Sequence, residues 1–137
     1  MTCELTDGRK SVAWVASCLT DAVYDLLTAT GAALKGQPGN VTFVEEPGCV
    51  ILGFLPSGDR LRIDVSRRAS WLSKDVAHTD RVERFELRTR TFAGSVLAAL
   101  QQMALIDEPA IYMKKWRHEY PRERVKALQA ALDERRD

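Results

Sequence analysis

Hydrophobic and polar residues alternate with a period of two in two stretches of the chain, 60–66 and 81–91. In the first, Leu61, Ile63 and Val65 alternate with charged or polar residues, and the second repeats the pattern around its own apolar residues. Successive side chains of a strand point to opposite faces, so this period predicts two strands with one buried and one polar face. The polar face would carry Arg60, Arg62, Asp64, Arg84, Glu86, Arg88 and Arg90.

Helical spacing and turn residues predict the other elements. After a capping serine, Ser11, apolar residues recur every three or four positions from Val12 to a glycine cluster that begins at Gly31, which predicts a long first helix. Short apolar runs separated by Pro-Gly and Ser-Gly turns predict further strands. The predicted elements are a helix at 11–34, strands at 41–46, 49–55, 60–66 and 81–91, and helices at 93–106, 109–118 and 121–134.

This order of elements predicts the fold class α+β. Consecutive strands with short turns form an antiparallel sheet, and helices before and after it can cover its apolar side. We therefore expect a two-layer sandwich in which a four-stranded antiparallel sheet has the N-terminal long helix and the C-terminal helices on one face. A length of 137 residues is typical of one domain, so we expect a single domain over 1–137.

Composition narrows the function classes. The net charge is −3 through Gly58 and +4 from Asp59 onward, which together make the total of +1, and this mixed balance argues against nucleic acid as a partner. The apolar N-terminal stretch is interrupted by aspartates and threonines, which argues against a membrane span. Three cysteines without paired spacing and the lack of a signal sequence at the start predict free thiols and a cytoplasmic location.

Candidate chemistry is sparse. Neither histidine has a partner at metal-ligand spacing, and no glycine-rich phosphate loop is present, so we expect no metal and no cofactor. His118 beside Glu119 can be read as an acid/base pair or as a surface or capping residue, and we favour the second. Cys49 can be read as a nucleophile, but a thiol at the start of an apolar strand is typical of a core residue. We expect a protein that is not an enzyme.

The stretch between Arg67 and Asp80 has no sustained period and predicts a long loop. Loops of this length in compact domains are often functional, so Trp71 is a candidate for a binding surface; a connector anchored by Trp71 is the plain alternative. A small enzyme with its site at His78 and Asp80 is a second hypothesis for the same loop. A secretion-type chaperone, a dimer that offers apolar grooves to an unfolded client, is a third hypothesis for the whole chain.

On the polar face of the two alternating strands, arginine outnumbers lysine five to none. Solvation alone accounts for a polar outer face on an antiparallel sheet. Guanidinium groups lose less on desolvation and make two-pronged contacts with carboxylates, which favours a protein partner with an acidic surface. The predicted partner-binding residues are Arg62, Asp64, Trp71, Arg84, Glu86, Arg88 and Arg90.

Several short motifs between Val41 and Leu132 suggest a family. They are the turn Glu46-Pro-Gly48, the segment Gly58 to Arg62, the helix pattern Phe92, Val96 and Leu100, and the ending Trp116, Tyr120 and Pro121. In these features the chain resembles small bacterial proteins that are similar in size and layout to the cytoplasmic immunity proteins of contact-dependent or polymorphic toxin systems. The resemblance implies a protein that neutralises a cognate toxin domain by direct binding. It assigns no role to any single residue.

Overall fold

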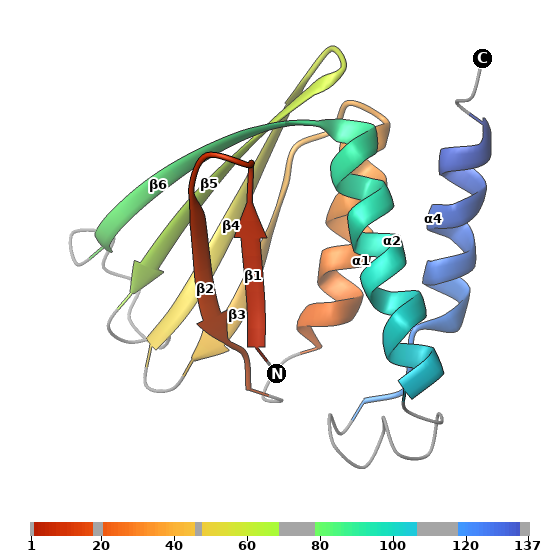
Figure 1. Cartoon of the computed structure of the whole chain (residues 1–137), viewed down its shortest axis with the longest axis horizontal. Helices are drawn as coiled ribbons and strands as arrows, with labels where there is room; N and C mark the ends of the chain where they lie inside the picture. The colour runs from red at the N-terminus through yellow and green to blue at the C-terminus, as the bar shows by residue number, and fades with distance from the viewer. Residues whose placement is uncertain (1, 18–20, 46–47, 69–78, 107–117, 135–137) are drawn as a thin grey trace.

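The computed structural model describes residues 2–17, 21–45, 48–68, 79–106 and 118–134. Within these residues the fold is α+β and its sheets are antiparallel, which confirms the predicted class. Figure 1 follows the chain through β1 (Thr2–Thr6), β2 (Ser11–Val15), α1 (Ala22–Leu34), β3 (Gly39–Glu45), β4 (Gly48–Ser57), β5 (Arg60–Arg68), β6 (Thr79–Arg88), α2 (Thr89–Ile106) and α4 (Arg122–Glu134).

The N-terminal region forms a β-hairpin, so the helix predicted over 11–34 is wrong in its first part. β1 and β2 pair antiparallel as a separate two-stranded sheet, joined by a turn in which Gly8 has a φ of 88°. Along β2, Trp14 is buried whereas Val15 is 57% exposed. This alternation has the period of a strand. Val12 and Ala16 lie on one face in either pattern, because a step of four residues returns to the same face in a helix and in a strand.

The helix begins later, at α1, and ends where the glycine cluster predicts. Asp21 caps its start, since a carboxylate oxygen of Asp21 accepts a hydrogen bond from the Tyr24 N–H at 3.2 Å. At the other end, Gly36 has a φ of 76°, and the Gln37 N–H donates to the Ala32 carbonyl at 2.9 Å. Glycine adopts this left-handed conformation without a steric penalty, so the helix stops here.

The four-stranded sheet has the order β3-β4-β5-β6, and β3, β4 and β5 lie where strands were predicted. Its register sets Phe43 opposite Val50 and Ile63 opposite Phe85, and all four side chains are buried. The predicted fourth strand, 81–91, is too long, because α2 already begins at Thr89 rather than at 93. The predicted helix 121–134 corresponds to α4, and the predicted helix 109–118 lies outside the described residues except for His118.

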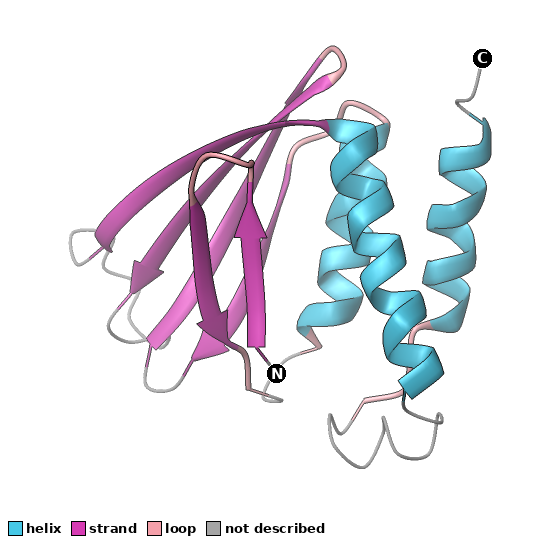
Figure 2. Ribbon diagram, in the orientation of Figure 1, coloured by secondary structure: helices cyan, strands magenta, loops and turns pink. Residues whose placement is uncertain are grey.

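The hairpin, α1 and α2 share one hydrophobic core with the buried side of this sheet. Trp14 of β2 contacts Phe43 of β3 with ring centroids 5.2 Å apart, and Phe54 of β4 meets Phe92 of α2 edge-on at 5.4 Å. Figure 2 shows α1, α2 and α4 grouped beside the four-stranded sheet, with the two-stranded hairpin in front of that sheet. The single sheet that we predicted therefore omitted a second sheet.

Side chains of the larger sheet hold the hairpin in place. One carboxylate oxygen of Glu45 accepts a hydrogen bond from the Val15 N–H at 2.8 Å, and the other accepts from Arg67. Arg67 also donates to the Ala13 carbonyl. Glu45 thus joins the two sheets. Edge groups of β2 are thereby satisfied by side chains in place of a neighbouring strand.

The helices described here include none that is both long enough and apolar enough to cross a lipid bilayer.

Candidate protein interface on the sheet

Six of the seven charged residues predicted for one polar face lie on the same face of β5 and β6. The register sets Arg62 opposite Glu86, Asp64 opposite Arg84 and Arg60 opposite Arg88. These six residues alternate with the buried residues of the same strands, so they point to the other side of the sheet. We call this set, Arg60, Arg62, Asp64, Arg84, Glu86 and Arg88, the arginine face.

Asp64 orients two of the arginines. Its carboxylate oxygens lie 3.3 Å from Nη2 of Arg62 and 3.2 Å from Nε of Arg84, one oxygen for each guanidinium. The side chains of Arg62 and Arg84 remain 39% and 59% exposed. Exposed ion pairs contribute little to stability, so the main effect of Asp64 is to position these two guanidinium groups while leaving them accessible.

Arg60 and Arg88 are directly opposite each other and exposed at one end of this face. Neither has an ion-pair partner among the described residues. Like charges in directly opposed positions destabilise a strand pair, because their Cβ atoms are only about 5 Å apart. With four arginines against two carboxylates, the arginine face has a formal charge of +2, and an acidic partner would relieve this repulsion.

Apolar side chains border the arginine face. Leu55 of β4 lies opposite Arg62 and is 42% exposed, and Val82 of β6 lies opposite Ser66 and is 59% exposed. Interfaces between proteins are enriched in arginine beside apolar residues, with the apolar area excluding water from the polar contacts. Arginine and exposed apolar side chains thus lie side by side on this face.

Two predicted site residues do not belong to this surface as described. Arg90 lies in α2, where its Nη2 atom donates to the Leu132 carbonyl at 2.6 Å and ties α2 to the end of α4. Its assignment to the charged strand face was wrong because the strand ends at Arg88 and the period changes there. Trp71 lies outside the described residues, as does His78.

The candidate catalytic residues among the described ones are His118 and Cys49. Nδ1 of His118 lies 4.0 Å from a carboxylate oxygen of Asp21, the residue that caps α1. Cys49 is buried, and burial raises the pKa of its thiol against a smaller opposing effect of Arg68, so the reactive thiolate is disfavoured. Within the described ranges, no three metal-ligating side chains come together.

A groove between β1 and α2 escaped the sequence analysis. It has a volume of about 550 Å³, and its walls include Leu5, Trp14, Phe92, Val96 and Met103. The groove depends on β1, which was not predicted as a strand. The available signal was the alternation of Cys3 and Leu5 with polar residues ahead of the Asp-Gly turn, a pattern only five residues long.

Comparison with protein-family models, curated proteins and solved structures finds no match to this chain.

Proposed function

We propose that this chain is a non-enzymatic protein-binding module, and that it serves as an immunity protein that neutralises a cognate bacterial toxin domain by covering part of its surface. The observation that carries the proposal is the arginine face, where positive charge is held in place beside exposed apolar side chains. The partner surface that complements it is acidic. The free thiols Cys3 and Cys49 fit the cytoplasmic location that such a protein requires.

Two features favour a partner over a merely solvated face. Arg60 and Arg88 repel each other in the free protein, so an anionic group placed between them gains from both. Arg62 and Arg84 are already oriented by Asp64, so they lose less conformational entropy on binding than free arginine side chains do. The hairpin, α1 and α2 bury their apolar side chains with the opposite side of the sheet, and Arg60, Arg84 and Arg88 are exposed on this side.

The test is co-expression with the toxin domain encoded beside the gene for this protein. The unaltered chain is expected to restore growth and to form a complex whose dissociation constant is measured by calorimetry. Replacing Arg84 and Arg88 by glutamate is expected to weaken binding by about a hundredfold or more, because each removed contact to a buried charge is worth about 2 kcal/mol or more.

The matched control makes the same change in charge elsewhere. Arg122 and Lys126 are both exposed on α4, and replacing both by glutamate also changes the net charge by four units. This control is expected to bind and to protect as the unaltered chain does. A complex that keeps its affinity after the Arg84 and Arg88 replacements would exclude the arginine face as the binding surface.

A further inference from the structure

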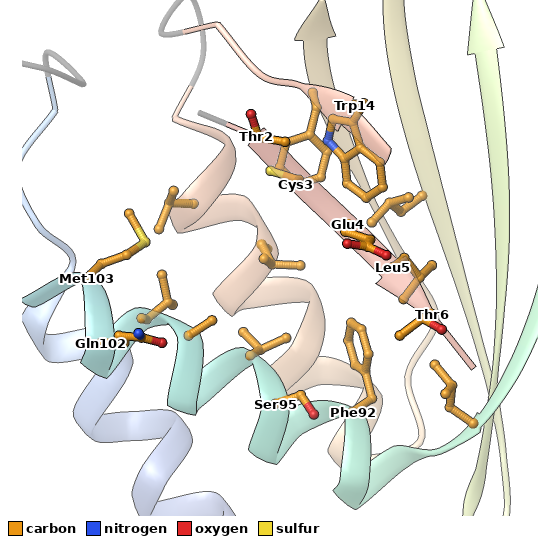
Figure 3. Close-up of a pocket in the computed structure, with 18 of the residues that line it drawn as sticks. Thr2, Cys3, Glu4, Leu5, Thr6, Trp14, Phe92, Ser95, Gln102 and Met103 are labelled. Carbon is orange, nitrogen blue, oxygen red and sulfur yellow. The ribbon is translucent and has the colours of Figure 1, made fainter. Parts of the chain in front are cut away.

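The groove between β1 and α2 has one wall made by a strand and one made by a helix. Figure 3 shows Thr2 to Thr6 of β1 on one side and Phe92, Ser95, Gln102 and Met103 of α2 on the other. Its volume of about 550 Å³ is within the range of ligand-binding clefts. Most of its lining side chains are apolar, and Glu4 is the one charged residue among them.

The strand wall carries unpaired backbone groups. The Ala13 carbonyl and the Val15 N–H bind side chains of the four-stranded sheet, so both point away from β1. In an antiparallel pair, two opposed residues turn their backbone groups either both toward the shared seam or both away from it. Glu4 is opposite Ala13 and Thr2 is opposite Val15. The backbone N–H and C=O groups of Glu4 and Thr2 therefore face away from β2, where no described residue binds them.

A second unsatisfied group lies at the same groove. The indole N–H of Trp14, a lining residue, is buried and has no acceptor among the described residues. A buried donor without an acceptor costs about 1–3 kcal/mol, so an occupant that brings carbonyl oxygens is favoured over a plain hydrocarbon.

We propose that the groove binds an extended segment of a partner protein, which adds to the free edge of β1 as a third strand. Alternate side chains of this segment are apolar and enter the groove, where they contact Phe92, Val96 and Met103. The intervening side chains face solvent, and one of them, a lysine or arginine, lies opposite Glu4. This inference is independent of the arginine face, and each surface is tested by its own variants.

Charge argues against a second copy of this chain as the occupant. If two β1 strands pair antiparallel with full overlap, Glu4 of one copy is directly opposite Glu4 of the other. Two carboxylates in that position repel each other. A partner segment with a basic residue at that position avoids this repulsion.

The first experiment uses a capped eight-residue peptide that alternates valine with threonine and has one lysine in place of a central threonine. Binding to the full chain is measured by calorimetry. Two further peptides are N-methylated, one at the valines and one at the threonines and lysine, because N-methylation removes hydrogen-bond donors from only one edge of the strand. In antiparallel pairing the N–H groups of the threonines and the lysine face β1, whereas those of the valines face away from it. Only the peptide methylated at the threonines and lysine is therefore expected to lose binding, by about tenfold or more for each lost hydrogen bond of roughly 1.4 kcal/mol.

The second experiment changes the protein. Glu4→Pro removes an outward N–H without removing a hydrogen bond of the hairpin, and Glu4→Asp is its control, since it keeps both the N–H and the negative charge. Ala99→Trp fills the groove, and Ala98→Trp places the same side chain on an exposed neighbouring position that does not line it. Glu4→Pro and Ala99→Trp are expected to lose peptide binding, whereas the two controls keep it; thermal unfolding verifies that all four are folded.

Three results would overturn the proposal. Equal effects of the two N-methylation patterns would exclude strand pairing. Stoichiometric binding of sodium laurate without binding of the peptide would identify an apolar small molecule as the occupant. A dimer in sedimentation experiments that Glu4→Pro converts to a monomer would identify a second copy of the chain.

Discussion

Removing the carboxylate of Glu45 is expected to release the β1–β2 hairpin from the four-stranded sheet. Glu45 accepts one hydrogen bond from the Val15 N–H, at 2.8 Å, and one from the guanidinium of Arg67. Arg67 in turn donates to the Ala13 carbonyl. The substitution Glu45→Ala therefore breaks both contacts of the carboxylate and leaves Arg67 with the carbonyl alone.

The size of the effect follows from these contacts. Hydrogen bonds to charged groups contribute about 1.5–3 kcal/mol each, so two would reach roughly 3–6 kcal/mol if they were fully buried. The side chains of Arg67 and Glu45 are 39% and 30% exposed, so water replaces part of each contact. With this discount we expect Glu45→Ala to lower the free energy of unfolding by about 2 kcal/mol, and the melting temperature by roughly 8 °C for a chain of this size.

Urea unfolding of single and double variants measures the contribution of the pair. Glu45→Gln keeps an acceptor for the Val15 N–H but removes the charge that attracts Arg67, so it should cost about half as much. Arg67→Met keeps the apolar stem, and combined with Glu45→Ala it should show a coupling energy of about 1 kcal/mol. Amide hydrogen exchange at Val15 should accelerate in Glu45→Ala but much less in Glu45→Gln.

The reasoning would be refuted by a Val15 amide that exchanges equally slowly in Glu45→Ala and in the unaltered chain. A loss of unfolding free energy below about 0.5 kcal/mol in Glu45→Ala would also refute it, because surface substitutions without structural consequence fall in that range.

Three further predictions concern the core, a thiol and a turn. Phe85→Ala removes a side chain with no exposed surface and should cost about 3–5 kcal/mol in urea unfolding; a cost below 1 kcal/mol would place Phe85 outside the core. Because burial raises the pKa of Cys49, iodoacetamide at pH 8 should modify this thiol at least about tenfold more slowly than free cysteine, as followed by peptide mass spectrometry. Hydrogen bonds from the Arg9 and Lys10 N–H groups lower the pKa of Asp7 below the usual 3.8. The ionised Asp7 carboxylate therefore stabilises the fold fully above pH 3.8, and this stabilisation is lost as the pH falls through the pKa of Asp7 in the folded chain. Acid titration of the melting temperature should show this loss in the unaltered chain and not in Asp7→Asn.

The strands of the large sheet were predictable because their signal is local. Leu61, Ile63 and Phe85 alternate with charged residues, and the geometry of a strand converts that alternation directly into two faces. The arginine face follows from this parity, without knowledge of the rest of the fold. The prediction that Arg90 belongs to this face was wrong because the chain changes from strand to helix at Thr89. The Thr89 N–H donates to the Asp59 carbonyl, a contact between residues distant in sequence.

The N-terminal hairpin was not predictable in the same way. The five residues of β2 fit a strand and the first turns of a helix equally well by apolar spacing. The choice is made by partners far away in sequence, since Trp14 packs on Phe43 and the outer edge of β2 is held by Glu45 and Arg67. Long-range contacts of this kind override local preference.

By itself, the sequence determined the α+β class, the strands of the larger sheet and the face on which their charged residues lie, because the alternation of apolar and charged residues is a local property of the sequence. Only the tertiary structure decided that a second sheet exists, that Glu45 and Arg67 fasten it, and that an apolar groove lies between β1 and α2. The groove has no counterpart in any local pattern. Its two walls come from opposite halves of the chain, and they meet only because both bury apolar side chains against the same face of the sheet.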